Sequence, residues 1–329
     1  MKTLFEPRKV YKPFEYPQYV KYFDTAKNSV WRPESVDMSL DLNDYNTRST
    51  ETERKIIREI LKTFTIMETH IGDYWADRVC AMFPKHEIVA AARFHSAFEA
   101  LHATAYDWLN ASLGIEDYDA FLGDPQALRK IGNYINCPND LISLAVFSAC
   151  GEGVSLFSSF SVLLSLSRSG RYKGLQQIIS WSALDEAQHS DMGCELFRDA
   201  IAELHDGAVP RDLAEQIREA MQITLDNEFD VIDTLFSYGN LDNINSRDLK
   251  AYIRYRAANR LDALGVTHDM VVPKNYKNVK SWFDVMVFGQ SDNDFFANAV
   301  DGGNYTALLS QDYKTYDFSK TEVKNWGIV

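Results

Sequence analysis

The chain has 329 residues, and 46% of them are hydrophobic, so it is long enough to bury a large core and is not intrinsically disordered. Its formal net charge of −13 argues against a nucleic-acid partner, because phosphate binding needs a basic face. The four cysteines are scattered, which favours reduced thiols in the cytoplasm. We expect a soluble protein, since the N-terminus has no apolar core of signal-peptide length and the most apolar run, Val154 to Ser167, is too short to span a bilayer.

An N-terminal arm precedes a helical pattern. Residues 1–48 are rich in proline, tyrosine and aspartate, and they predict an extended arm that wraps the body of the protein. Thr50 and Glu53 have the spacing of a capping box, which predicts the start of a long helix. This helix should end before Pro84, because proline cannot continue it. A second helix is expected from there to Gly114, since glycine commonly ends helices.

The rest of the chain predicts further helices. Capping residues, prolines and glycines divide it into helical stretches at about residues 124–135, 140–170, 173–206, 210–238 and 246–265. The second stretch contains Gly151-Glu152-Gly153, where two helix-weakening glycines predict a bulged or flexible turn. No strand-type alternation of any length interrupts the pattern. We therefore expect an all-α fold, with one helical-bundle domain at 1–300 and a flexible C-terminal tail at 301–329.

One short pattern, Glu-x-x-His, occurs twice in these helices. Residues three apart share a helix face, so each copy points a carboxylate and an imidazole in the same direction. A lone glutamate on another predicted helix precedes each copy. In chain order, the candidate ligands are Glu68, Glu99, His102, Glu152, Glu186 and His189. Four carboxylates and two imidazoles from four helices are the ligand set of a di-iron or di-manganese carboxylate site.

The ligand types favour iron or manganese over zinc, because zinc prefers fewer ligands in a tetrahedral shell. Two metals that share glutamates can pass electrons to oxygen, so the expected chemistry is activation of an oxidant. Tyr106 follows His102 by one helical turn and should face the metals. A phenol held in a dry pocket beside an oxidised cluster can form a radical, and we prefer this interpretation to an ordinary core tyrosine.

Together these residues resemble the radical-generating small (beta) subunit of class I ribonucleotide reductase, over nearly the whole chain. The motifs that carry the resemblance are Trp31-Arg-Pro-Glu-Ser-Val-Asp37, Glu99-x-x-His-x-x-x-Tyr106, Glu152-Gly before a Ser/Phe-rich helix, and Asp185-Glu186-x-x-His189. The resemblance implies a ferritin-like fold, a homodimer, and an oxidoreductase that supplies a radical for the reduction of ribonucleotides to deoxyribonucleotides.

The resemblance also implies roles for individual residues. One metal would be held by Glu68, Glu99 and His102, and the other by Glu152, Glu186 and His189. Tyr106 would store the radical. His102, Asp185 and Trp31 would form the hydrogen-bonded start of a radical route out of the subunit. A carboxylate on the outer nitrogen of a ligand imidazole also has a physical role, because it fixes the tautomer.

In the family, the C-terminal tail binds the large catalytic subunit and carries a tyrosine that relays the radical. Tyr313 and Tyr316 are the candidates in this sequence, and nothing in the sequence chooses between them. By resemblance, the large subunit holds the substrate. The chain accordingly has no Gly-x-x-x-x-Gly-Lys phosphate loop.

Some positions depart from the family pattern. Glu68 stands where many members have aspartate, and Ser182 stands where apolar residues are common. These differences leave open the metal pair (Fe/Fe, Mn/Mn or Mn/Fe), the oxidant, and whether Tyr106 or the cluster holds the working radical. His95, one turn before the first Glu-x-x-His, is expected to support the ligands or to pack in the core.

Two other functions are compatible with the six candidate ligands. The first is a ferritin-like oxidase that binds a long-chain ligand, and the second is metal storage without redox catalysis. Neither would need Trp31 or an aromatic tail, so we prefer the reductase interpretation.

Overall fold

The structure is a computed structural model, and it describes residues 3–115 and 140–289. Residues Met1–Val287 form one compact unit. The expected helix at 124–135, the expected boundary at residue 300, and the tail with both candidate relay tyrosines lie outside the described residues. The domain boundaries therefore stay a prediction.

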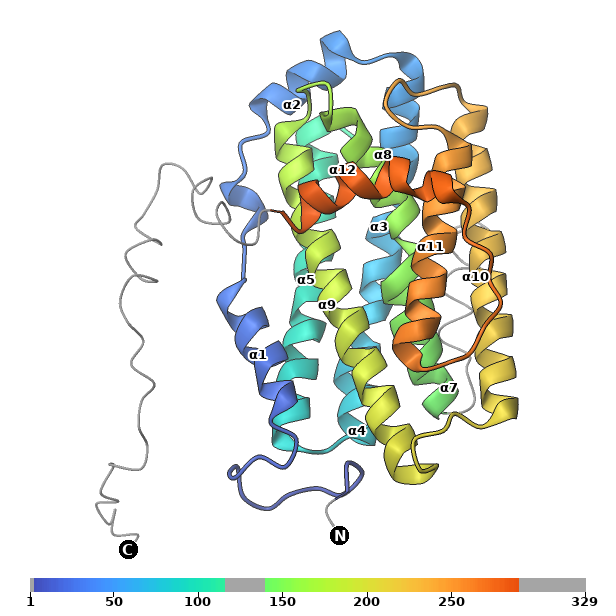
Figure 1. The fold of residues 1–329 in the computed structure, drawn as a ribbon. Helices are drawn as coiled ribbons and strands as arrows, with labels where there is room; N and C mark the ends of the chain where they lie inside the picture. The colour runs from blue at the N-terminus through green and yellow to red at the C-terminus, as the bar shows by residue number, and fades with distance from the viewer. Residues whose placement is uncertain (1–2, 116–139, 290–329) are drawn as a thin grey trace, which may run out of the picture. The chain divides into compact units, whose positions relative to one another are not determined.

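Long helices with roughly aligned axes form a bundle (Figure 1). They are α3 (Glu51–Asp73), α5 (His86–Leu113), α9 (Lys173–Leu204), α10 (Arg211–Ser237), α11 (Ser246–Leu264), and a composite helix made of α7 (Asp140–Ala145), a π-helical segment (Val146–Ser155) and α8 (Phe157–Ser167). Helix α12 (Lys277–Val287) crosses the bundle and packs on α8, α9 and α11 (Figure 1). Among the described residues there is no strand, only an isolated bridge between Leu241 and Ile244. The all-α prediction is confirmed.

Local capping explains where the helices begin and end. The Thr50 hydroxyl accepts a hydrogen bond from the Glu53 backbone N–H, and the Glu53 carboxylate accepts one from the Thr50 N–H, so the predicted capping box is present. Gly114 ends α5 with a left-handed φ of 71°, and Gly265 ends α11 in the same way. Such a backbone conformation costs glycine little, and it turns the chain out of the helix.

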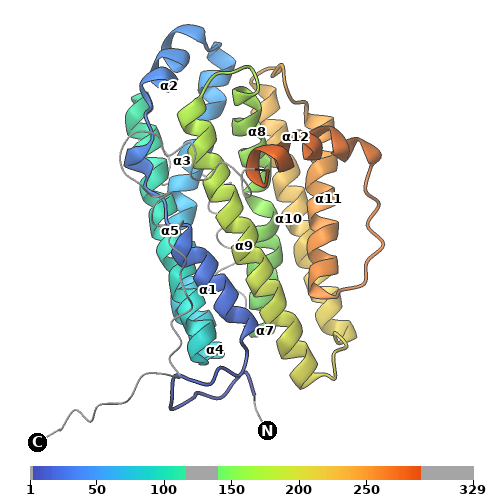
Figure 2. The same ribbon diagram turned by 60° about the vertical axis from the view of Figure 1, so that its left-hand side comes forward.

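The N-terminal arm is partly helical, which corrects the expected extended arm. Residues Gln18–Asn28 form α1, which lies against α5 and α9 (Figure 2), and Ser39–Asn43 form the short α2. The stretch between Pro17 and Asn28 contains no proline or glycine to interrupt a helix. Its composition suggested an irregular segment, but its tyrosines are spaced three apart and meet one face of α9.

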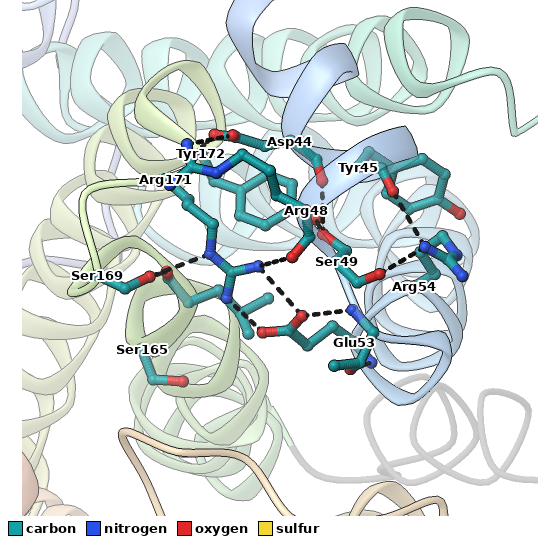
Figure 3. A network of polar contacts seen from close by, with 12 residues as sticks. Asp44, Tyr45, Arg48, Ser49, Glu53, Arg54, Ser165, Ser169, Arg171 and Tyr172 are labelled. Atoms are coloured by element: carbon teal, nitrogen blue, oxygen red, sulfur yellow. Dashed lines mark hydrogen bonds and ion pairs between the residues drawn. The ribbon is translucent and has the colours of Figure 1, made fainter.

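A polar network ties the end of this arm to the first turns of α3 and α9 (Figure 3). Arg171 donates two hydrogen bonds to the Glu53 carboxylate and one, at 3.1 Å, to the Arg48 carbonyl. The Asp44 carboxylate accepts from the Tyr172 backbone N–H at 3.0 Å and from Arg48 at 2.7 Å. The same glutamate that caps α3 therefore also holds the chain just before α9.

The composite helix is the most apolar part of the bundle. Its stretch Leu141–Ser167, 27 residues long, has the length and hydropathy of a membrane span, which corrects the expectation that the apolar run is too short. However, 89% of its most apolar window is buried inside the bundle, as in the core helix of a soluble protein. Burial by neighbouring helices explains its composition without a bilayer.

Candidate dinuclear metal centre

All six predicted ligands meet in the core of the bundle. Helix α3 supplies the first glutamate, α5 and α9 each supply a Glu-x-x-His pair, and the π-helical segment supplies the remaining glutamate. None of the six is more than 1% exposed. Their donor atoms form two groups, each within 4.8 Å: Glu68, Glu99, His102 and Glu186, and then Glu99, Glu152, Glu186 and His189. Glu99 and Glu186 belong to both groups, which is the arrangement of bridging carboxylates.

Both imidazoles turn the same nitrogen toward the carboxylates. Nδ1 of His102 lies 2.9 Å from Oε1 of Glu186, and Nδ1 of His189 lies 2.7 Å from Oε1 of Glu99. The second nitrogen of His102, Nε2, points the other way, toward Asp185 at 3.2 Å. The helical spacing thus orients one nitrogen of each ring into a common volume.

Among the described residues, the only ion-pair partners of these carboxylates are the two imidazoles. Both carboxylate oxygens of Glu68 are buried without a hydrogen bond. Burial, together with the charges of Glu186 and Glu99, raises the pKa of Glu68 well above its ordinary value. Burial and the charge of Glu186 raise the pKa of Glu152 to about 8. Buried carboxylates are stable only when they are paired, protonated or bound to metal, so this donor set fits two divalent cations.

The π-helical segment around Glu152 is the bulge that Gly151-Glu152-Gly153 predicts, and it is tightly packed. The Gly153 carbonyl accepts a hydrogen bond from Nε of Arg256 on α11 at 2.9 Å. The Ser155 hydroxyl donates to the Cys150 carbonyl at 3.0 Å. A Cβ on Gly153 would lie 2.6 Å from Cδ of Arg260, so any other residue at this position would require the Arg260 side chain to shift. The bulge is therefore confirmed, and neighbouring side chains hold its backbone in place.

Tyr106 lies next to this cluster in a dry pocket. Its side chain is fully buried, and its ring centroid is 6.3 Å from that of His102 and 4.8 Å from that of Phe64. Burial, followed by the charge of Glu68, raises the pKa of the phenol well above its ordinary value. The phenol is therefore neutral and shielded from water.

Trp31 and Asp185 connect to the other side of His102. The indole Nε1–H of Trp31 donates to Oδ2 of Asp185 at 2.8 Å, the same oxygen that lies 3.2 Å from Nε2 of His102. The Trp31 and His102 rings are 5.9 Å apart and inclined by 23°. All three side chains are at least 95% buried. The arm thus places Trp31 in hydrogen-bonded contact with a candidate ligand through a single carboxylate.

Two further residues contact the cluster: Trp75, for which no role was predicted, and His95, which was expected to support the ligands or to pack in the core. Trp75, fully buried, donates its indole N–H to Oε1 of Glu152 at 2.8 Å. His95 places its ring 4.2 Å from the His189 ring, and neither of its nitrogens has a hydrogen bond. Burial and the nearby His189 hold the pKa of His95 well below its usual range, so this imidazole is neutral. The sequence held one indication that Trp75 lies near the cluster: it follows Glu68 by seven residues, two helical turns, so an α-helix would place both on one face.

A comparison with protein families decides the classification. Residues 8–269 match the family model described as "Ribonucleotide reductase, small chain". The chain belongs to this family.

Curated relatives of the small-chain family match along most of their length. The probable ribonucleoside-diphosphate reductase small subunit 048L of Invertebrate iridescent virus 3 is 28% identical, over 90% of this chain and 84% of the relative. The ribonucleoside-diphosphate reductase small chain of Nicotiana tabacum is also 28% identical, over 91% of this chain and 89% of the relative.

Solved structures confirm the ferritin-like fold. A putative class I ribonucleotide reductase from Bacillus halodurans matches with a TM-score of 0.72 at 18% identity, over 82% of this chain and 99% of that one. The dimanganese(II) NrdF protein of Streptococcus sanguinis matches with a TM-score of 0.72 at 17% identity, over 84% of this chain and 99% of that one. The protein is thus a small subunit of an oxidoreductase with a dinuclear metal centre, and it acts with a large subunit.

Proposed function

We propose that this small subunit generates an oxidising radical, stores it, and passes it to the large catalytic subunit, which reduces ribonucleoside diphosphates to deoxyribonucleotides. The supporting observation is one continuous buried arrangement: six metal-type ligands, a dry phenol at Tyr106, and the hydrogen-bonded series His102, Asp185 and Trp31. A storage protein needs only the first of these parts. A ligand-binding oxidase needs no route outward.

Six residues would hold two ions of iron or manganese. Glu68 and His102 would bind one ion, Glu152 and His189 the other, and Glu99 and Glu186 would bridge the two. When bound, the ions supply the oxidising power that amino-acid side chains lack. The donor set does not choose between Fe/Fe, Mn/Mn and Mn/Fe, because both metals accept imidazole and carboxylate ligands.

Tyr106 would store the radical in this proposal. Its hydroxyl keeps its proton at neutral pH, and its pocket excludes water, so an oxidised ring would be protected from reduction by solvent components. The alternative is that the metal cluster holds the working radical and Tyr106 only packs beside it. The experiment below separates the two.

The route outward would begin at Trp31. Asp185 accepts hydrogen bonds on one side from the Trp31 indole, and on the other side it fixes the tautomer of His102 with Nδ1 toward the metals. The tail from residue 301 would dock on the large subunit and continue the route through Tyr313 or Tyr316. We further propose that the subunit is a homodimer and works in the cytoplasm.

The test uses the full chain loaded with Fe(II) or Mn(II), electron paramagnetic resonance (EPR), and a ribonucleoside-diphosphate reduction assay with the cognate large subunit. Tyr106→Phe should remove a tyrosyl signal and reduce turnover to background, whereas the control Tyr255→Phe on α11 should do neither. If turnover survives without the tyrosyl signal, the cluster holds the working radical. A wild-type chain that binds no metal, or supports no reduction with its large subunit, would overturn the proposed function.

A further inference from the structure

Trp75 contacts the candidate ligand Glu152 directly, although no role was predicted for Trp75. It stands in the π-helical segment Tyr74–Val79 that follows α3, and its indole N–H donates to Oε1 of Glu152 at 2.8 Å. Both side chains are at least 99% buried. A neutral donor satisfies one carboxylate oxygen without adding charge, so it does not compete electrostatically with a cation at the other oxygen.

The Trp75 ring is fixed by its neighbours. It packs edge-on against His95 with centroids 4.8 Å apart at 88°, and against Phe147 at 5.6 Å and 76°. Phe147 belongs to the same π-helical segment as Glu152. The indole therefore has little freedom to rotate away, and its donor stays aimed at the carboxylate.

The other oxygen of Glu152 is left for metal. Oε2 has no hydrogen bond, and it lies 3.7 Å from Nδ1 of His189, within the second ligand group. The backbone beneath it is also held, because Arg256 donates to the Gly153 carbonyl and the Arg260 side chain fills the space beside Gly153. Side chain and backbone are thus restrained independently.

Glu68, the counterpart of Glu152 on the other side of the cluster, has no such restraint. Neither of its oxygens accepts a hydrogen bond. A carboxylate with both oxygens free can bind through one or both of them. Where a rigid donor occupies one lone pair of an oxygen, that oxygen is the poorer metal ligand, and binding through the other oxygen is favoured.

We propose that Trp75 is a positioning residue that holds Glu152 as a one-oxygen ligand on the His189 side, leaving Glu68 as the terminal carboxylate that is free to change its binding mode. This inference rests on the proposed metal binding by the six ligands. The bulge around Glu152 is present, and neighbouring side chains contact both its backbone and the Glu152 carboxylate.

The test is a titration of the full-length apo chain with Mn(II), with free Mn(II) followed by EPR. Trp75→Phe removes the N–H and keeps an aromatic ring. This substitution should weaken the binding of one of the two Mn(II) ions by about 10- to 100-fold, the usual effect of removing a hydrogen bond to a ligand. The affinity for the other ion should change much less. The matched control is Trp282→Phe on α12, which touches no ligand and should leave both affinities unchanged.

A double-mutant cycle separates positioning from packing. In a Glu152→Ala background the indole has lost its acceptor, so adding Trp75→Phe should not weaken Mn(II) binding further. An equal loss in both backgrounds would mean that Trp75 acts only through packing, and it would overturn the inference. If the wild-type chain binds no Mn(II), the proposed function itself fails. If the wild-type chain binds two ions and Trp75→Phe binds both with the same affinities, only the proposed role of Trp75 is wrong.

A second measurement covers the case in which Trp75→Phe does not fold. In the apo wild type labelled with 15N-tryptophan, the indole N–H groups of Trp75 and Trp31 should both exchange slowly with solvent, and one of these slow resonances should shift in Glu152→Ala. An indole spectrum that Glu152→Ala leaves unchanged would show that the hydrogen bond is absent, and the inference would be wrong.

Discussion

At the scale of single residues, Asp185 joins two parts of the molecule through one oxygen. Its Oδ2 accepts from the Trp31 indole at 2.8 Å and lies 3.2 Å from Nε2 of His102. A carboxylate oxygen has two lone pairs and carries no N–H, so it can accept from both donors at once. This one oxygen therefore both fixes the imidazole and links it to the arm.

Asp185→Asn tests this link, because asparagine keeps the shape but replaces the shared carboxylate oxygen with an amide oxygen, which is a weaker acceptor for both donors. We expect nucleotide turnover per bound metal pair to fall by about 10- to 100-fold. The tyrosyl EPR signal per bound pair should be kept, since Tyr106 lies on the other side of His102. Asp212→Asn, at an exposed position on α10, is the control. If the tyrosyl signal and the turnover fell together, Asp185 would be needed to form the metal site and would have no separate role in the radical route.

Four of the six candidate ligands could be paired from the sequence because helical spacing determines which residues share a face, whereas the lone Glu68 and Glu152 were assigned from their order along the chain. Glu99 and His102 share a face whatever the tertiary fold, and so do Glu186 and His189. Trp75 could not be predicted in the same way. Its partner is on another helix. The direction of the Trp75 side chain also depends on a π-helical segment, whose wider turn changes the helix face on which the residue lies, and sequence spacing does not reveal this change.

At the scale of elements, α1 is attached to α9 by a row of phenols and carboxylates. Tyr19 donates to Asp199 at 2.7 Å, and Tyr22 donates to Glu195 at 2.8 Å, one turn apart on both helices. Burial, then the charge of Asp199 and the hydrogen bond to it, raises the pKa of Tyr19 far above its ordinary value. For Tyr22, burial and the hydrogen bond to Glu195 raise the pKa in the same direction.

These raised pKa values predict a loss of stability in alkali. Below the ordinary tyrosine pKa of about 10, both folded and unfolded chains keep the proton, so the hydrogen bonds contribute fully. Above it, the unfolded chain releases protons that the folded chain retains, and the free energy of unfolding falls. Tyr19→Phe should cost about 1 kcal/mol at pH 7 and reduce this alkaline slope. Urea unfolding between pH 8 and pH 11 measures both effects, and an unchanged slope would contradict the assignment.

Some helix boundaries can be predicted from the few residues next to them, and others cannot. The capping box at Thr50 and the terminal glycines Gly114 and Gly265 mark ends that depend on a few adjacent residues, and the structure confirms them. Helix α1 was missed because its stability comes from contact with α5 and α9 rather than from its own composition. Tertiary packing of this kind overrides propensity, so a single sequence does not reveal it.

At the scale of the whole molecule, the ion pair of Glu53 and Arg171 joins positions that are far apart in sequence, at the starts of α3 and α9 (Figure 3). Burial alone would raise the pKa of Glu53. The hydrogen bonds from Arg171 and the Thr50 backbone outweigh it, so the pKa is lowered. The pair therefore favours the folded state whenever the glutamate is ionised.

The lowered pKa predicts the pH range in which the pair matters. Its contribution is fully present above the ordinary glutamate pKa of about 4.3, and it is lost as the pH falls through the lower folded-state value. Arg171→Met should reduce the free energy of unfolding by about 1 to 3 kcal/mol at pH 7 and by less at pH 3. Denaturant unfolding at the two pH values measures this. Arg211→Met, at a side chain that is 91% exposed, is the control and should have almost no effect.

The composite helix also has a consequence for how the polypeptide is made. Helices α9, α10 and α11, which bury it, are synthesised after it, so the nascent chain leaves the ribosome with the apolar stretch Leu141–Ser167 not yet covered by them. Uncovered surface of this kind favours aggregation and recruits chaperones. A fragment that stops at Ser167 would therefore be insoluble rather than an independent half, and the protein becomes soluble only once the later helices have closed over this segment.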